Sequence, residues 1–166
     1  PAVAMSDAGG LSRRAAENLY WLGRYLERAQ TSLRLLRMVL AATGDGAADS
    51  DAPPDRAEPL LQALAYQIGA DVQAAGAAPL AQQLGDLLAN AAQVDSVAFD
   101  LNALAHAAEA VREHLPEDAL HGLVDLTQPL AALPADAAME QIDGCVRALL
   151  ARTWALAGAV GQGMER

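Results

Sequence analysis

The sequence contains little cysteine and no long apolar run. Its single cysteine, Cys145, cannot form a disulfide within the chain. Arg, Asp, Glu or Gln interrupts each apolar stretch well before the roughly 20 residues that a membrane-spanning helix needs. The first residues lack the charged and then apolar pattern of a signal peptide. We therefore expect a soluble protein of the cytoplasm.

Basic residues are also scarce. The chain has 11 Lys and Arg residues against 21 Asp and Glu residues, which gives a net charge of -10. Such a charge repels phosphate backbones and anionic lipid headgroups. Nucleic acid and membrane surfaces are therefore not expected as partners.

Catalytic and metal-binding patterns are missing from the sequence. It has no serine elbow, no histidine at a recognisable spacing from a nucleophile and no glycine-rich nucleotide loop. Among the residues near His106, His114 and His121, Asp118 and His121 lie at a helical spacing of three, but a di-iron bundle needs two such pairs and further carboxylates. We expect no metal, no cofactor and no self-sufficient enzyme, and we expect Cys145 to be a small buried apolar residue.

The apolar content points to helices. Hydrophobic residues make up 53% of the chain but aromatic residues only 4%, so alanine and leucine dominate, and both favour helix over strand. A length of 166 residues fits one domain. The sequence predicts an all-α, up-and-down bundle of about six helices, three of them long.

The first predicted helix follows residues 1–10, which we expect to be a flexible segment or linker. It begins after Ser12 as N-cap and continues to about Thr43. Apolar residues at alternating spacings of three and four form one seam along it: Ala15, Leu19, Leu22, Leu26, Ala29, Leu33, Leu36 and Leu40. Residues 43–58 are acidic and rich in Gly and Pro, which predicts a loop.

Five further helices are predicted from apolar spacing and capping residues. The second and third cover 59–75 and 79–93, and Pro79 opens the third. Asp95 or Ser96 caps a fourth that continues to Pro116. A fifth covers 117–132, and Asp136 caps a sixth that ends at the glycines of 161–163.

The first helix carries a second stripe beside its leucine seam, formed by Asn18, Trp21, Tyr25, Arg28, Ser32, Leu35 and Val39. A guanidinium at Arg28 can stack on a ring and still hold a carboxylate. Glu27 projects about 100° away from Arg28, so we expect each to meet a different element. An interhelical salt bridge is the favoured interpretation of Arg28 and Glu27, and ligand binding or catalysis is the alternative.

Two other features of this helix lead to predictions. Gly23 in a helix interior costs roughly 1 kcal/mol relative to alanine, which a close approach of another helix or of a ligand would explain, and close helix packing is the favoured explanation. Arg13 and Arg14 follow Ser12 at a helix end that is already electropositive. These three residues are a candidate anion site, with contacts to acidic neighbours as the alternative.

Residues Leu11 to Leu36, with the sequence LSRRAAENLYWLGRYLERAQTSLRLL, resemble the opening of the alpha-E domain, a helical family named for a Glu-Arg motif. In this chain the motif is Glu27-Arg28. The matching positions are Leu11, Ser12, Arg13, Ala16, Glu17, Asn18, Leu19, Tyr20, Trp21, Leu22, Gly23, Arg24, Tyr25, Glu27, Arg28 and Ala29. A weaker likeness extends from Asp95 to Leu115. The resemblance implies that 11–166 is the first half of a duplicated domain, with a second motif helix expected after it.

The resemblance also implies a functional setting. Alpha-E proteins occur beside or fused to circularly permuted ATP-grasp ligases, transglutaminase-like proteins and amino-terminal-nucleophile hydrolases of bacteria. The favoured hypothesis is an accessory or scaffold domain that docks such a ligase or its peptide substrate, with Asn18, Trp21, Arg24, Tyr25, Glu27 and Arg28 as the motif residues. One alternative is a site in which Arg13, Arg24 and Arg28 hold a carboxylate or phosphate while Glu27 transfers a proton. Another is a homo-oligomerising bundle.

Overall fold

Helices account for all the regular secondary structure in the parts of the chain that the computed structural model describes, which are residues 11–43, 57–68 and 79–164. The helices are α1 (Arg13–Thr43), α2 (Ala57–Ile68), α3 (Leu80–Ala89), α4 (Val97–Ala110), the 3₁₀ helix η3 (Arg112–His114), α5 (Glu117–Val124), α6 (Gln128–Ala131) and α7 (Met139–Met164). The all-α prediction is confirmed. The predicted segment 1–10, most of the 43–58 loop and the end of the predicted 59–75 helix lie outside the described residues.

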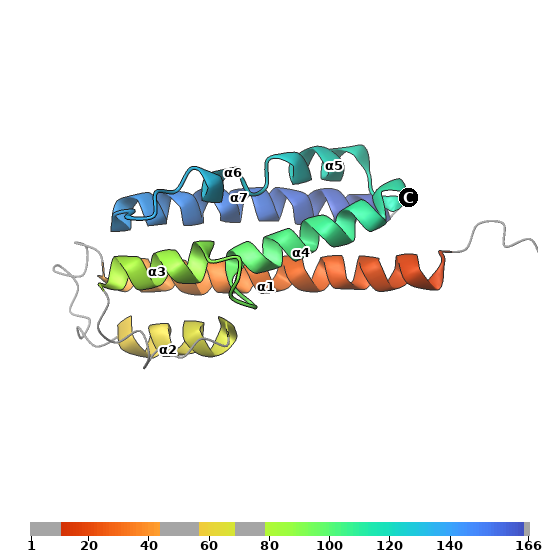
Figure 1. Cartoon of the computed structure of the whole chain (residues 1–166). Coiled ribbons are helices and arrows are strands. Elements are labelled where there is room, and N and C mark those ends of the chain that lie inside the picture. Colours follow the sequence, from red (N-terminus) through yellow and green to blue (C-terminus); the bar gives the residue numbers. More distant parts are fainter. Residues whose placement is uncertain (1–10, 44–56, 69–78, 165–166) are drawn as a thin grey trace, which may run out of the picture.

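The long helix α1 is the axis of the fold (Figure 1). It begins as predicted, because the Ser12 hydroxyl accepts a hydrogen bond from the Ala15 backbone N–H at 3.1 Å. It ends at Thr43, also as predicted. Its leucine seam is buried for most of its length. At 1.5 Å per residue α1 is about 46 Å long, so it can contact most of the other helices.

The helices α4 and α7 both run antiparallel to α1, while α5 and α6 return along α7 (Figure 1). Arg28 meets Asp100 in the first turn of α4, whereas Ala15 packs in one cluster with Val111, just after the end of α4. The Gln30 side chain donates a hydrogen bond to the Thr153 carbonyl of α7 at 3.1 Å. The short helix α2 packs along the C-terminal half of α1. The arrangement is the up-and-down bundle expected from the sequence.

Several predicted helix boundaries were wrong. The helix α3 ends at Ala89 rather than at 93. The helix α4 ends at Ala110 rather than at Pro116, and the tighter 3₁₀ helix η3 lies between Ala110 and Pro116. The predicted fifth helix is two helices, because Pro129 lies in the first turn of α6 and a proline is tolerated only near a helix start. Arg152 of α7 holds the intervening turn by donating to the Asp125 carbonyl and, at 2.8 Å, to Gln128 Oε1.

The start and end of α7 also differ from the prediction. The helix begins at Met139, so Asp136 is not its cap. Instead the Gln141 side chain accepts a hydrogen bond from the Ala138 N–H at 2.8 Å, the reach-back bond of a capping box. The glycines near the C-terminus do not stop the helix, which continues to Met164.

Two apolar clusters form the core. The larger joins α1, α2, α3, α4 and α7 around Leu33, Leu36 and Leu149, and the smaller joins the N-terminal half of α1 to the end of α4. Cys145 belongs to the larger cluster, as expected of a small buried apolar residue, and burial raises the pKa of its thiol to about 11. No helix in the described ranges has the length and apolarity to cross a membrane.

Candidate functional site

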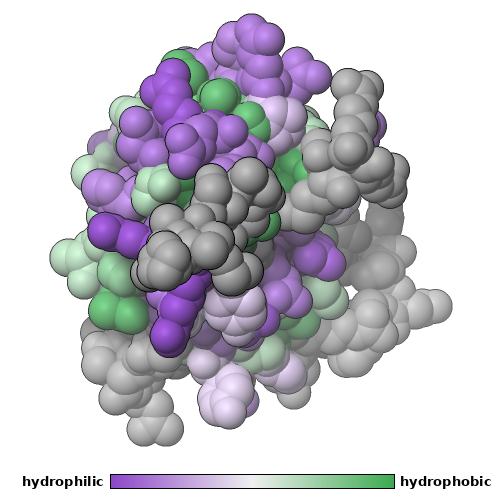
Figure 2. All heavy atoms as spheres, turned by 90° about the vertical axis from the view of Figure 1, so that its right-hand side faces the viewer, coloured by the Kyte–Doolittle hydropathy of each residue, from purple (hydrophilic) through white to green (hydrophobic). Residues whose placement is uncertain are grey.

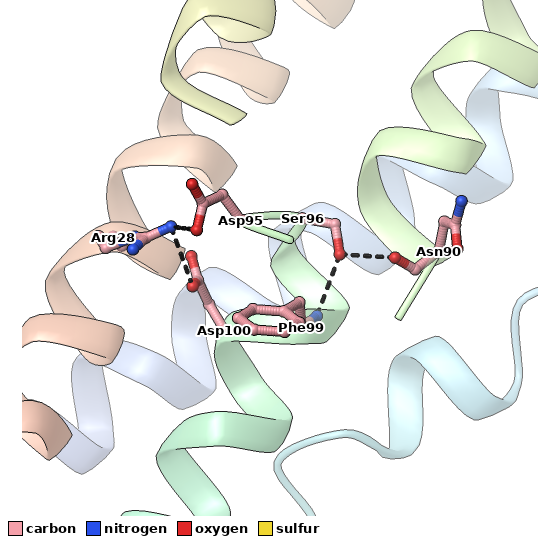
Figure 3. Close-up of polar contacts among 6 residues, drawn as sticks. All are labelled: Arg28, Asn90, Asp95, Ser96, Phe99 and Asp100. Atoms are coloured by element: carbon pink, nitrogen blue, oxygen red, sulfur yellow. Dashed lines mark hydrogen bonds and ion pairs between the residues drawn. The ribbon is translucent and has the colours of Figure 1, made fainter. Parts of the chain in front are cut away.

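The Arg28 guanidinium joins α1 to the turn between α3 and α4 (Figure 3). One of its terminal nitrogens, Nη2, contacts an Asp95 carboxylate oxygen and lies 3.5 Å from Oδ1 of Asp100. Arg28 therefore makes an interhelical ion pair with two carboxylates, as the favoured interpretation of the sequence predicted. The guanidinium is about one quarter exposed, so it lies at the edge of the interface.

The turn that carries Asp95 is fixed by its own hydrogen bonds. Ser96 caps α4, because its hydroxyl accepts from the Phe99 N–H at 3.1 Å and donates to the Asn90 carbonyl at 2.8 Å (Figure 3). Of the two cap candidates, Ser96 is thus the cap, which leaves Asp95 free to pair with Arg28. Asp95 has a φ of 71°, a left-handed conformation that aspartate tolerates better than most residues.

Asp100 is the most buried member of the cluster that Arg28, Asp95 and Asp100 form. Its side chain is 1% exposed, and neither carboxylate oxygen has a hydrogen-bond partner. The distance of 3.5 Å to Arg28 gives a charge interaction rather than a good hydrogen bond. Burial raises the pKa of Asp100 to about 6, and the positive charge of Arg28 only partly opposes this shift. A buried carboxyl that titrates near neutral pH is a feature of functional sites and of structural ion pairs alike.

Glu27 behaves differently from Arg28. Its carboxylate pairs with Arg24 of the same helix at 2.8 Å, and its side chain is 64% exposed. The prediction that Glu27 meets a different element was wrong. An exposed pair three residues apart forms with little constraint from the rest of the fold. Within the Glu-Arg motif, only the arginine connects helices.

The stripe on α1 has an open half and a covered half. Ser32 and Val39 are buried in the C-terminal half, along which α2 packs. In the N-terminal half, Asn18, Trp21 and Tyr25 line a groove of about 360 Å³, and the opposite wall is formed by Ala103, His106 and Ala107 of α4. The groove begins about one helical turn from Arg28.

Three aromatic rings form a rigid unit at this groove. The rings of Trp21 and Tyr25 are stacked, with centroids 5.7 Å apart and planes at 29°. Tyr20 meets Trp21 edge to face at 5.4 Å. Tyr20 and Trp21 are nevertheless 61% and 48% exposed. Exposed aromatic rings held by one another can contribute large contact areas at little conformational cost.

The candidate anion site at the start of α1 consists of exposed groups that already have contacts. The Ser12 hydroxyl caps the helix, and Arg13 pairs with Glu17 at 3.1 Å. Arg14 is exposed. These contacts agree with the alternative in which the arginines meet acidic neighbours, and binding of an anion here stays a prediction.

The residues of the catalytic alternative are not gathered at one place. Arg13 and Arg28 are 15 residues apart on one straight helix, which is about 22 Å. Arg24 and Glu27 pair with each other on the exposed face, whereas Arg28 points to α4. Within the described ranges there is also no group of three or more His, Cys, Asp or Glu side chains that could hold a metal ion.

Sequence reasoning did not identify Asp100 as the partner of Arg28. The signal was present, because Asp100 lies three residues after Val97 and four before Leu104, on the apolar face of α4. A charged residue on such a face needs a partner from another element. Asn90, whose carbonyl accepts from Ser96, had no distinguishing signal.

The comparison with known families agrees with this geometry. Residues 11–166 match the family Alpha-E, described as "A predicted alpha-helical domain with a conserved ER motif". No curated protein and no solved structure matches the chain significantly. The Glu-Arg pair that the sequence resemblance assigns to this motif consists of the exposed Glu27 and of Arg28, which joins α1 to the start of α4.

Proposed function

Because the chain belongs to the Alpha-E family, we propose that it is a helical accessory domain that docks a circularly permuted ATP-grasp-type ligase, or that ligase's peptide substrate, in a bacterial system for peptide synthesis or modification. The single observation that carries the docking role is the stack of the exposed Trp21 ring on the half-buried Tyr25 ring, which together line the groove between α1 and α4. The type of partner follows from the family resemblance of the α1 sequence.

The Arg28 cluster supports docking rather than catalysis. Arg28 is engaged by Asp95 and Asp100, so its charge holds α1 and the start of α4 together instead of facing a substrate. The groove is built from the same two helices, one turn away. A surface whose backbone is fixed before binding loses less entropy when a partner docks, which favours affinity.

Homo-oligomerisation is the weaker alternative for the same surface. Two copies would each carry a net charge of -10 and would repel each other at low salt. A catalytic role is also less favoured, because Arg13, Arg24, Glu27 and Arg28 do not converge.

The test uses the two tryptophans, which are almost equally exposed. Trp21 lines the groove at 48% exposure, whereas Trp154 lies on α7 at 54% exposure. Binding of the immobilised protein to an ATP-grasp ligase from the same genome, and to the peptide substrate of that ligase, is measured by interferometry. We expect Trp21→Ala to weaken binding at least about tenfold, the size of a modest hot spot, and Trp154→Ala to leave it unchanged. Wild-type protein that binds neither the ligase nor the peptide would overturn the proposal.

A further inference from the structure

One stripe of α1 is covered by a helix along half of its length only. In the C-terminal half, Val39 is fully buried and Leu35 packs against the core, and α2 contributes Leu60, Leu61 and Leu64 to the same cluster. In the N-terminal half, no described helix takes the place of α2, and Figure 1 shows α2 beside one half of α1 only. The open half therefore lies on the same helix that α2 packs along, beyond the end of α2.

The open half has the shape and composition of a helix-binding groove. Stacked rings form its α1 wall, and the small side chains of Ala103 and Ala107 form its α4 wall. Small residues on one side leave room for the bulky anchors of an incoming helix, which insert at positions i, i+3 or i+4, and i+7. Figure 2 shows the end of the bundle where α1 begins, and the described residues visible there are mostly hydrophilic with small separate hydrophobic areas.

We propose that the groove formed by Asn18, Trp21 and Tyr25 with Ala103, His106 and Ala107 binds a short amphipathic helix with a basic outer face, supplied by the docked partner. This inference rests on the proposed function and adds the kind of segment that the partner contributes. The helix would continue along α1 from the place where α2 stops. α2 itself, with 12 residues, shows that a helix of this length packs along α1.

The charges near the groove favour a basic partner. Glu17 lies one turn before Trp21, and Glu109 lies one turn after His106, and both carboxylates are exposed. Glu17 pairs with Arg13, and Glu109 pairs with Arg112, in the exposed setting where such pairs are weak and can be exchanged. The net charge of -10 attracts a basic segment and opposes a second copy of this chain.

The closing experiment uses Trp21 as the reporter. The chain has two tryptophans, so in the Trp154→Phe variant all tryptophan emission comes from Trp21. The probes are three 14-residue peptides: leucine and lysine at helical amphipathic spacing, the same composition in scrambled order, and the first pattern with glutamate in place of lysine. We expect a blue shift and saturable binding with the patterned basic peptide, and at least about tenfold weaker binding with the other two.

A pair of groove and control variants makes the result specific. Ala103→Gln narrows the groove without adding charge, and Ala151→Gln makes the same change on an exposed position of α7. Circular dichroism checks that both variants keep the wild-type fold. We expect Ala103→Gln to weaken peptide binding at least about tenfold and Ala151→Gln to leave it unchanged. Equal binding of the scrambled peptide, no binding of the patterned peptide, or equal effects of the two variants would overturn the inference.

The same variants separate this inference from the proposed function. Ligase that binds wild-type protein and Ala103→Gln equally would remove the groove as the docking surface but keep the docking role. Patterned peptide that binds in the groove, together with a ligase and substrate that do not bind at all, would keep the groove but overturn the proposed partner.

Discussion

Arg28 and Asp100 face each other from α1 and α4 at 3.5 Å, yet neither oxygen of the Asp100 carboxylate receives a hydrogen bond. The cluster therefore holds a buried charge that is compensated only in part. Asp95 takes the closer contact with the same guanidinium nitrogen. From this relationship follow predictions about stability, because a partly compensated buried carboxylate should oppose folding when it is ionised.

Replacing Asp100 by asparagine should stabilise the protein at neutral pH. Burial raises the pKa of Asp100 from 3.8 to about 6, and this shift corresponds to about 3 kcal/mol of folding free energy lost when the group is ionised. Asparagine cannot ionise, and Arg28 keeps Asp95 as its partner. Because the new amide also lacks hydrogen bonds, we expect a gain on the order of 1 to 3 kcal/mol at pH 7.5, measured by urea unfolding.

The pH dependence of this gain gives an independent check. A carboxyl whose pKa is raised by folding binds more protons in the folded state, so its contribution to stability is largest at low pH and is lost as the pH rises through about 6. The difference between Asp100→Asn and wild type should therefore grow between pH 4 and pH 7. A constant difference over this range would show that Asp100 does not titrate as its burial implies.

Removing Arg28 should have the opposite effect. Arg28→Met leaves Asp100 buried without a cation, which typically costs about 3 to 5 kcal/mol. Glu27→Gln is the matched control, because its exposed pair with Arg24 should change the free energy of unfolding by less than about 1 kcal/mol. Adding Asp100→Asn to Arg28→Met should recover most of the loss. If Arg28→Met were as stable as wild type in chemical denaturation, the arginine would be held for a ligand instead.

The turn before α4 can be tested separately from the charge of Asp95. Asp95→Gly and Asp95→Ala both remove the contact with Arg28, but only glycine adopts the φ of 71° without steric cost. We expect the alanine variant to be less stable than the glycine variant by about 1 kcal/mol. Equal thermal midpoints would mean that the turn changes conformation when the carboxylate is lost.

The sequence predicted the fold because the fold depends on local signals. The three-four spacing on α1, α4 and α7 fixes one buried face per helix, and caps at Ser12 and Ser96 mark two starts. The break between α5 and α6 has a local signal, Pro129, which the predicted helix 117–132 ignored. The contacts that hold this break come from Arg152 of α7, and a pattern near the break does not reveal them.

Only the α1 side of the candidate site was predictable from the sequence. The stripe containing Trp21, Tyr25 and Arg28 was visible because helical spacing fixes which residues of α1 share a face. The partners Asp95 and Asp100 lie about 70 residues away along the chain, and their contact depends on how α4 packs against α1. The place of Asp100 on the apolar face of α4 shows that it needs a partner from another element, but a single sequence does not show which residue that partner is. The expectation that another helix packs closely against Gly23 was wrong for the same reason, because it also depended on how the helices pack.

Gly23→Ala should stabilise the protein and leave the groove unaffected. The sequence suggested that another helix approaches Gly23, but a Cβ built there has no heavy atom within 4 Å in the described structure, so that expectation was wrong. Alanine should therefore raise the free energy of unfolding by about 1 kcal/mol. Gly85→Ala on α3, where the space is also open, is the control for a helix glycine of the same kind.

The same variant, Gly23→Ala, also tests which face of α1 the partner covers. Gly23 and Trp21 are two residues apart and so point about 160° away from each other around α1, which means that a peptide in the groove should not detect the new methyl group. If Gly23→Ala, unlike Gly85→Ala, weakens binding of the ligase but not of the groove peptide, then the partner also covers the outer face of α1, and the open space at Gly23 is filled only in the complex.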